Sequence, residues 1–400
     1  FSFMSERKDR NKRNCWLTYT NEKTHEIIRE NIMRAPKYAG KIHGIGARYC
    51  PSIEDKVVRF ADKDRHQLFV EPEGLDTTEM YVQGMSTSMP IDVQYAFLRT
   101  IPGFEDVKMM RPAYAIEYDL LDPLQLYPTL EVIKLPGLYS AGQSNGTSGY
   151  EEAAAQGLVA GINAALKIQG KDPFILARHE AYIGSLVDDL VTKGADEPYR
   201  MMTSRSEYRL ILRQDNADLR LTEKGHSIGL VGEERYARFL ERKKKYEEAM
   251  DYIRTQRFTP KEEINRALES MGTAPLTTGT GADQILKRPE MTYRKMMETL
   301  GCPSFDEEAV EEMEITVKYE GYIARQEAAV RKAARMENEK LPLDMDYLSL
   351  DGISTEARQK MDKIRPLSLG QAARIPGVSP ADISVLMVYV KQRKGKKGAE

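Results

Sequence analysis

The feature that most constrains the fold is a glycine-rich loop at residues 142–149, between a short apolar segment and a long alanine-rich run. Residues 138–141 read as a buried strand, and the run to about Leu166 reads as a helix whose small residues allow close packing on a sheet. A strand, a glycine loop and a helix in this order are typical of doubly wound α/β domains. The sequence therefore predicts α/β organisation in this part of the chain.

The same loop has the chemistry of a cofactor cradle. The first N–H groups of a helix have no partner within the helix, and the helix dipole adds partial positive charge there. Glycines let a ligand approach the backbone closely. The alternative is a tight strand-to-helix connection that binds nothing, and the loop by itself leaves the two interpretations about equal.

The rest of the chain divides into a mixed part and a helical part. After about residue 170, strand signals nearly vanish and helical periodicity with many charged residues takes over. We place one boundary near 170 and a softer one at 300–315. Before residue 170 we expect strands at 15–19, 66–70, 107–110 and 115–118. We expect helices after a cap at Asn21 or Thr20, from Ser52 to about Phe60, and from Asp92 to Arg99.

Composition excludes several classes of protein. With 59 basic and 61 acidic side chains, no global charge bias indicates a nucleic acid partner, so such a surface must be local. No apolar run approaches the roughly 20 residues that span a bilayer, so we expect no membrane association. The three cysteines fit no zinc or disulfide spacing, which favours a reducing cytoplasm, and no histidines pair at metal-ligand spacing, so no metal is expected.

Cys50 is the cysteine whose surroundings favour reactivity. Ser52 and Asp55 resemble a helix-capping box, so Cys50 would lie just before a helix N-terminus and beside Arg48. Both features stabilise a thiolate. The alternative is a small buried hydrophobic side chain, the commoner fate of a free cysteine, and position alone slightly favours it.

An arginine-rich segment follows at residues 200–220. Arg205, Arg209 and Arg213 recur every four residues, so a helix would place them on one face that suits phosphate contacts. Tyr199 and Tyr208 offer stacking surfaces for an unpaired base. The alternative is a structural helix held by salt bridges to nearby acidic residues, and the two interpretations weigh about equally.

Several stretches resemble one family, and they span nearly the whole chain in family order. The family is MnmG/GidA, the large flavin subunit of the tRNA uridine 5-carboxymethylaminomethyl modification enzyme. Such a series is far more specific than any single motif. The stretches are residues 48–56, 111–119, 141–153, 203–210, 215–221, 288–293 and 318–326.

The resemblance implies a fold class and a domain order. It implies an α/β flavin-binding domain of the two-dinucleotide-binding, Rossmann-like type, incomplete here, followed by an all-α C-terminal region. The implied domains are the remainder of an inserted NADH-engaging domain (1–45), the C-terminal part of the FAD-binding domain (46–170), a helical domain with tRNA-binding arginines (171–314) and a C-terminal helical subdomain (315–400). The family's glycine fingerprint before the first helix is absent, so we expect a truncated chain that is inactive alone.

The resemblance also implies a reaction and its participants. The family builds a carboxymethylaminomethyl group on C5 of the wobble uridine, U34, of tRNA. It uses FAD, NADH and 5,10-methylenetetrahydrofolate as the one-carbon donor. The expected partners are tRNA, a GTPase subunit that joins the homodimer in a heterotetramer, and no membrane; the expected location is the cytoplasm.

Matching the family motifs residue by residue implies the site. The catalytic residue is Cys50, matching a family cysteine thought to take part. The FAD contacts are Gly142, Gln143, Asn145, Gly146, Thr147, Gly149, Tyr150 and Glu151. The NAD contacts are Gly46, Ala47, Arg48, Tyr49, Cys50, Pro51, Ser52, Ile53, Glu54, Asp55, Lys56, Val57, Val58, Arg59 and Phe60. The tRNA-binding arginines are Arg200, Arg205, Arg209, Arg213 and Arg220.

Three other functions compete with this one. A folate- and flavin-dependent tRNA uracil methyltransferase resembles the flavin domain but lacks a long helical C-terminal region, so residues 315–390 argue against it. A non-catalytic tRNA-binding or assembly subunit is a different class, and flavin absorbance would discriminate it. A generic NADH oxidase leaves the arginine segment and the C-terminal helices without a task.

Overall fold

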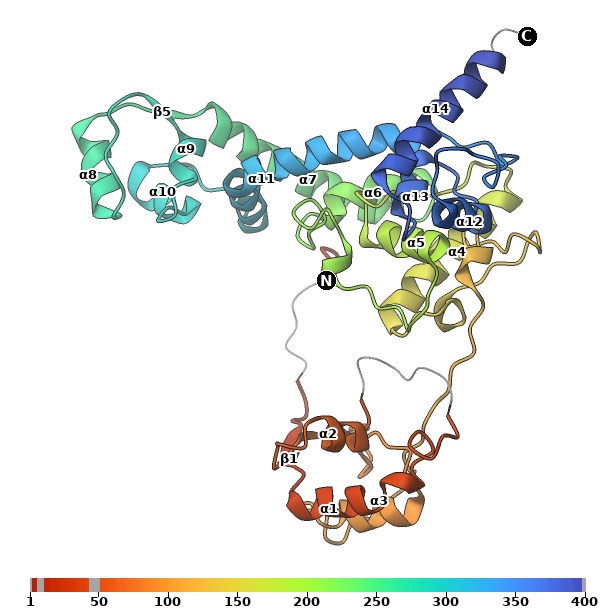
Figure 1. Ribbon diagram of the computed structural model, residues 1–400. Helices are drawn as coiled ribbons and strands as arrows, with labels where there is room; N and C mark the ends of the chain where they lie inside the picture. Colours follow the sequence, from red (N-terminus) through yellow and green to blue (C-terminus); the bar gives the residue numbers. More distant parts are fainter. Residues whose placement is uncertain (1, 6–10, 43–50, 398–400) are drawn as a thin grey trace.

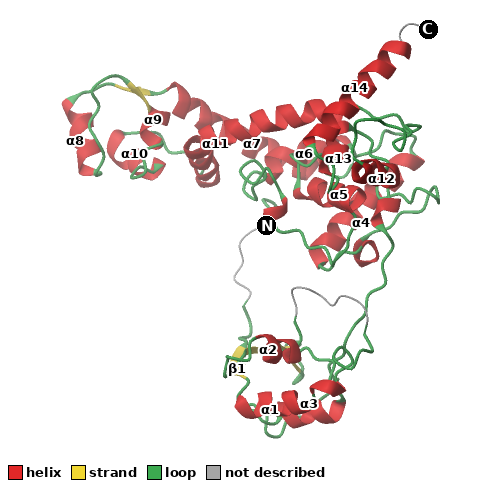
Figure 2. Ribbon diagram, viewed as in Figure 1, coloured by secondary structure: helices red, strands yellow, loops and turns green. Residues whose placement is uncertain are grey.

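The computed structural model describes residues 2–5, 11–42 and 51–397 of the chain. Figure 1 shows two parts: a small lower lobe, whose core lies between residues 27 and 104, and a larger upper body. The extended segment 111–121 runs between them. Helices dominate the upper body, and the strands are short (Figure 2).

The lower lobe packs three helices against a small antiparallel sheet. The sheet has the order β1-β2-β3, in the register Trp16↔Val70 and Val70↔Val82. Leu68 points into the core, where it meets Ile28, Val57 and Phe97. The elements are β1 (Trp16–Tyr19), α1 (Glu22–Glu30), η1 (Ile32–Arg34), α2 (Ile53–Arg59), β2 (Gln67–Pro72), β3 (Met80–Gln83) and α3 (Ile91–Leu98).

Capping residues set the starts of two of these helices as the sequence predicts. Asn21 accepts a hydrogen bond from the Thr24 N–H, and the Thr24 hydroxyl accepts one from the Asn21 N–H, which is a complete capping box. Ser52 accepts from the Asp55 N–H at the start of α2. Each such cap satisfies a helix N–H that would otherwise lack a partner, and contributes about 1 kcal/mol.

The strands expected at 107–110 and 115–118 are wrong. Neither segment pairs with a strand, and both belong to the extended connection between the two parts. The side-chain amide of Gln94 bonds both the N–H and the carbonyl of Ala113, each at 2.9 Å, in place of a neighbouring strand. Large side chains such as Met110 and Tyr114 are therefore exposed there despite their strand-like pattern.

The buried strand expected at 138–141 is also wrong. This segment forms one isolated bridge, Glu131↔Tyr139, and Leu138 is 50% exposed. Its backbone pairs with residues 130–132 through two bonds, from the Val132 N–H to the Leu138 carbonyl and from the Ser140 N–H to the Leu130 carbonyl. This pairing stops at a single bridge and does not extend into a strand of a sheet. The helix that follows, α4 (Tyr150–Ile168), is confirmed.

The upper body is a helical assembly around α4 and α5, with a long helical arm. Leu126, Leu130, Val159 and Val187 form a shared core between the segment before the glycine loop and these two helices. The elements are η2 (Pro123–Gln125), η3 (Gly142–Asn145), α4, α5 (Tyr182–Lys193), η4 (Thr203–Arg205), α6 (Ala217–Ser227), α7 (Glu233–Thr255), β4 (Arg257–Phe258), α8 (Glu262–Ser270), β5 (Thr280–Gly281), α9 (Ala282–Leu286) and α10 (Tyr293–Leu300).

The arm consists of α7 and the 32-residue helix α11 (Glu307–Asn338), which lie side by side. Their far ends share a core with α8, α9 and α10, in which Tyr293 and Met296 are fully buried. The near end of α11 reaches the last helices, α12 (Thr355–Ile364), α13 (Leu369–Arg374) and α14 (Pro380–Lys397), which have a core of their own. Where domains divide along the chain stays a prediction.

Candidate functional site

Three buried polar side chains hold the glycine loop in shape. The Gln156 carbonyl oxygen accepts from the Gly142 N–H at 3.2 Å and from the Asn145 amide at 2.8 Å. The Gln156 amide donates to the Thr147 hydroxyl, which donates to the Gly142 carbonyl, both at 3.0 Å. Asn145 and Gln156 are fully buried, so these bonds have no competition from water.

Two glycines in the loop adopt conformations that other residues avoid. Gly142 has φ +89° and Gly146 has φ +82°. A Cβ atom at Gly146 would also lie 2.7 Å from the Cβ of Ala195, so the loop approaches the segment after α5 closely. The glycines therefore serve the turn itself, whether or not a ligand binds.

The front of α4 has the properties that an anionic group requires. Its N-cap is Gly149, no side chain caps its first turn, and Tyr150 at its start is 93% exposed. Its first N–H groups thus remain available to a phosphate or a flavin carbonyl. Among the other expected FAD contacts, Gln143 is exposed and its amide donates to the Asp119 carbonyl.

The expected NAD segment is described from Pro51 onward, and it contains the Ser52-capped helix α2. Asp55 binds the Lys37 ammonium at 2.6 Å and the Tyr38 hydroxyl at 2.9 Å. Burial and the Asp55 carboxylate raise the pKa of Tyr38 to about 12. Glu54 is buried and accepts from both the N–H and the hydroxyl of Ser88. These acids support α2 from within the lobe.

Cys50 lies outside the described residues, as do the other predicted NAD contacts Gly46, Ala47, Arg48 and Tyr49. The helix that follows them, α2, belongs to the lower lobe, whereas the glycine loop and α4 belong to the upper body (Figure 1). The catalytic role of Cys50 stays a prediction.

The helix expected to align Arg205, Arg209 and Arg213 does not form. Residues 206–215 make turns between η4 and α6. The Gln326 side chain on α11 accepts from the N–H groups of Leu210 and Ile211 and donates to the Glu207 carbonyl, so it fixes these turns from outside. Tertiary contacts override the four-residue spacing.

The predicted tRNA-binding arginines consequently have different surroundings. Arg213 binds Asp215 at 2.9 Å and Glu312 at 2.5 Å, and Arg220 bonds Asn216 and the Arg213 carbonyl. Arg205 lies 4.2 Å over the Tyr199 ring. Arg209 is exposed, and among the described residues no ion pair holds it.

Arg200 lies at the glycine loop. Its guanidinium donates to the Ser148 carbonyl at 3.1 Å and lies 3.6 Å from the Glu152 carboxylate in the first turn of α4.

A buried ion-pair network behind this loop was missed by the sequence reasoning. Arg178 binds Asp188, Asp189 and Glu207, and Arg374 of α13 binds Asp188 with two nitrogens at 2.7 Å. Burial raises the pKa of Asp189, but Arg178 and Lys193 outweigh burial and lower it. The available signal was the pair of adjacent acids in an otherwise apolar run, residues 186–191.

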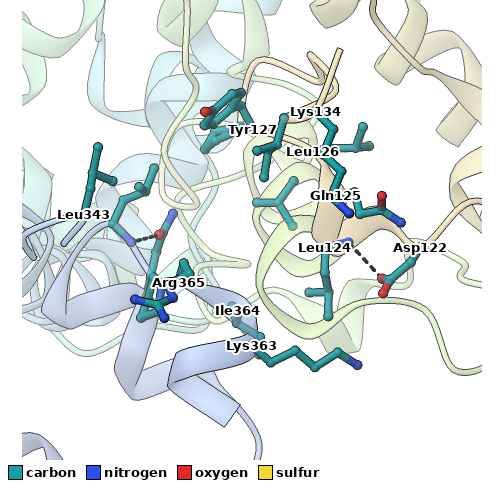
Figure 3. A pocket seen from close by; sticks show the side chains of 16 residues that line it. Asp122, Leu124, Gln125, Leu126, Tyr127, Lys134, Leu343, Lys363, Ile364 and Arg365 are labelled. Carbon is teal, nitrogen blue, oxygen red and sulfur yellow. Dashed lines mark hydrogen bonds between the residues drawn. The ribbon is translucent and has the colours of Figure 1, made fainter. Parts of the chain in front are cut away.

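A cavity of about 600 Å³ lies elsewhere, between residues 122–134 and the C-terminal helices (Figure 3). Leu124, Leu126 and Ile364 form its apolar wall, and Lys363 and Arg365 lie at its edge. None of the predicted site residues lines it. Among the described residues, no cluster of acidic, histidine or cysteine side chains could hold a metal ion, and no helix is both long and apolar enough to cross a bilayer.

Three family models match the chain and together cover most of it. Glucose inhibited division protein A matches residues 1–172. The tRNA modifying enzyme MnmG/GidA C-terminal helical domain matches residues 233–327, and its C-terminal helical bundle matches residues 329–400.

Similar proteins carry the same name. The tRNA uridine 5-carboxymethylaminomethyl modification enzyme MnmG of Caldicellulosiruptor saccharolyticus is 56% identical over 399 residues, and that of Clostridium kluyveri is 57% identical over 398. These alignments cover 99% of this chain but 64% and 63% of the relatives. The chain thus spans less than two thirds of the length of these relatives.

The fold agrees with a solved structure. Aquifex aeolicus GidA, in its form II crystal, is 47% identical and superposes with a TM-score of 0.80 over 96% of this chain and 59% of that one. The predicted class, a Rossmann-like flavin-binding domain followed by a helical C-terminal region, is therefore confirmed. The chain belongs to the MnmG/GidA family.

Proposed function

We propose that this chain is part of an FAD-dependent enzyme that modifies C5 of the tRNA wobble uridine. The names of its relatives state a tRNA uridine 5-carboxymethylaminomethyl modification for those proteins. The observation that carries the proposal is the similarity to these relatives along 99% of the chain. The glycine loop agrees with it, because Gly142 and Gly146 in the family motif adopt the positive φ values that glycine allows. The proposed product carries the carboxymethylaminomethyl group named for the relatives.

The flavin would bind at the front of α4. When bound, FAD supplies redox chemistry that amino-acid side chains lack. In this chain the first-turn N–H groups of α4 would hold an anionic part of the cofactor, and Gln143 would exchange its bond to the Asp119 carbonyl for one to the cofactor. The buried amides of Asn145 and Gln156 hold the loop rigid, so little entropy is lost when the ligand arrives.

The remaining participants follow from the family motifs. NADH would engage the segment that ends in the Ser52-capped helix, and methylenetetrahydrofolate would deliver one carbon. The Cys50 thiolate would act on the uracil ring by adding at C6, because C5 is a poor nucleophile until such an addition occurs. Of the five arginines, exposed Arg209 fits a phosphate contact best, since Arg213 and Arg220 are engaged within the protein.

The proposed assembly is a cytoplasmic homodimer that joins a GTPase subunit. We assign a docking role to α12, α13 and α14, because these helices have a separate core. They contact the body through the ion pair of Arg374 with Asp188. A non-catalytic binding subunit is the competing function.

The test uses the full-length protein. We expect flavin absorbance in the purified sample, and modification of U34 in a tRNA incubated with the GTPase partner, NADH and methylenetetrahydrofolate. A colourless protein that binds tRNA and ignores added FAD would overturn the proposal in favour of a binding subunit.

Cys50→Ser in the same protein should fold and retain FAD but lose at least about 100-fold in modification rate, because the hydroxyl is a far weaker nucleophile than the thiolate. Cys15→Ser is the matched control, since Cys15 is an exposed cysteine outside the predicted site. Unchanged modification by Cys50→Ser would remove Cys50 from the mechanism.

A further inference from the structure

The glycine loop has a partner segment about fifty residues further along the chain. The Tyr199 N–H donates to the Gly146 carbonyl at 2.8 Å, and the Ser148 N–H donates to the Tyr199 carbonyl at 3.0 Å. Thr147 and Tyr199 thereby form a parallel bridge. The path of the loop between Gly146 and Ser148 is thus determined by Tyr199, which no local sequence motif indicates.

Two other side chains hold Tyr199 in place. Its hydroxyl donates to the buried Asp189 carboxylate at 2.8 Å, and Arg205 covers its ring. Tyr199 is almost fully buried, so the segment 199–201 has a fixed position beside the loop.

The next residue, Arg200, clamps the N-terminus of α4. Besides its bond to the Ser148 carbonyl, its guanidinium lies between the Glu152 and Glu151 carboxylates, at 3.6 and 3.9 Å. The Met201 N–H donates to Glu152 at 2.8 Å. A Cβ atom at Gly149 would lie 2.1 Å from the Arg200 guanidinium and 1.9 Å from the Glu152 carboxylate, so a larger N-cap residue would displace these two side chains.

The positive charge of Arg200 also offsets the negative charge of Glu152. Glu152 is 3% exposed, and one of its carboxylate oxygens has no hydrogen-bond partner. Without Arg200 this buried negative charge would lack its cation at the helix end that must receive an anionic cofactor. Arg200 therefore neutralises a charge that would otherwise repel the ligand.

We infer that Arg200 is a positioning residue for the flavin-binding loop rather than a tRNA contact: it fixes Gly149 and offsets the charge of Glu152, so that the first-turn amides of α4 face the cofactor. The inference rests on the proposed function. It also separates Arg200 from Arg209, although both lie in the arginine-rich segment 200–220.

The experiment compares arginine variants of the full-length apoprotein. FAD is titrated by flavin fluorescence, and tRNA affinity is then measured at saturating FAD and two salt concentrations. Arg200→Ala should raise the Kd for FAD about tenfold, as expected for losing a charge-assisted bond, and leave tRNA affinity and its salt dependence unchanged. Arg209→Ala should weaken tRNA binding and reduce its salt dependence, and it should leave the Kd for FAD unchanged. Arg294→Ala, which replaces an exposed arginine on α10, should change neither the FAD affinity nor the tRNA affinity.

A double variant distinguishes positioning from general support of the fold. Arg200→Ala with Glu152→Gln should bind FAD more tightly than Arg200→Ala alone, because the uncompensated charge is gone. Arg200→Lys should lose less than Arg200→Ala. If Arg200→Ala does not fold, Arg200→Gln replaces it, with a similar expected loss.

Two results would overturn the inference. One is an FAD affinity within about twofold of the parent in the Arg200 variant, below the loss of even one ordinary hydrogen bond. The other is weakened tRNA binding with unchanged FAD binding. A parent protein that binds no FAD would instead overturn the proposed function itself.

Discussion

At the scale of single residues, the spacing of charges in the sequence does not predict which side chains form ion pairs. Arg213 lies in the arginine row, yet it forms ion pairs with Asp215 and with Glu312 on α11, almost a hundred residues away. Glu312 is nearly fully buried, and one of its oxygens has no partner. Burial and the neighbouring Asp215 carboxylate raise the pKa of Glu312 to about 7, while the pKa of Asp215 is lowered. The proton of this pair therefore resides on Glu312.

This pair predicts a pH dependence of stability. The folded-state pKa of Glu312 exceeds its unfolded value of 4.5, so its contribution to stability is fully present below pH 4.5 and is lost as pH rises through about 7. Glu312→Gln is neutral at every pH. Between pH 5 and 8 the Tm difference between variant and parent should therefore shift by about 2–4 °C in favour of the variant.

The control is Glu311→Gln, an exposed neighbour on the same helix, whose Tm difference should stay constant over that range. Parallel Tm curves for the parent and Glu312→Gln would mean that Glu312 is ionised throughout.

At the scale of elements, the turns at 206–215 depend on one side chain from another helix. Gln326 satisfies two N–H groups and one carbonyl of these turns, at 3.1 to 3.3 Å. Gln326 thereby holds the turns that contain the exposed Arg209 in one conformation.

Gln326→Ala should loosen these turns without unfolding α11. The amides of Leu210 and Ile211 lose their acceptor, so their hydrogen exchange should accelerate by about tenfold, the equivalent of one hydrogen bond. tRNA affinity should fall with it, and FAD affinity should not. Gln284→Ala, an exposed glutamine on α9, is the control. Unchanged exchange at Leu210 and Ile211 would show that the turns hold their shape without Gln326.

At the scale of the whole molecule, the C-terminal helices join the body through polar contacts around Arg374. This side chain binds Asp188 of α5 and Glu337 of α11, and it is 20% exposed. Because α12, α13 and α14 have a separate core, losing Arg374 should release them without unfolding them.

Arg374→Ala should therefore increase proteolytic cleavage near the end of α11, while α12 to α14 and residues 341–353, which share one core, resist digestion. The Asp188 side chain is 13% exposed, so removing this partner costs up to about 3 kcal/mol, enough to populate the undocked form. Lys363→Ala, an exposed lysine on α12, should cleave like the parent. Digestion of this C-terminal core at the same rate as the end of α11 would mean that it does not fold without the body.

The sequence alone determined the family and those elements whose signals are local. Capping residues at Asn21 and Ser52 and the alanine-rich run of α4 predicted helices that the structure contains, since a cap and a helix period act within a few residues. Gln156 was in principle detectable, as a polar residue on the small apolar face of α4.

Only the tertiary structure decided which strands pair and which charges are free. Residues 107–118 have a strand-like pattern but pair with no strand among the described residues, and residues 138–141 pair at one bridge, Glu131↔Tyr139, so neither segment becomes a strand of a sheet. Arg200, Arg209 and Arg213 look equivalent in sequence, yet they lie at the glycine loop, at the surface and in a buried ion pair, respectively. Such contacts join residues fifty to a hundred positions apart, a distance over which sequence periodicity carries no information.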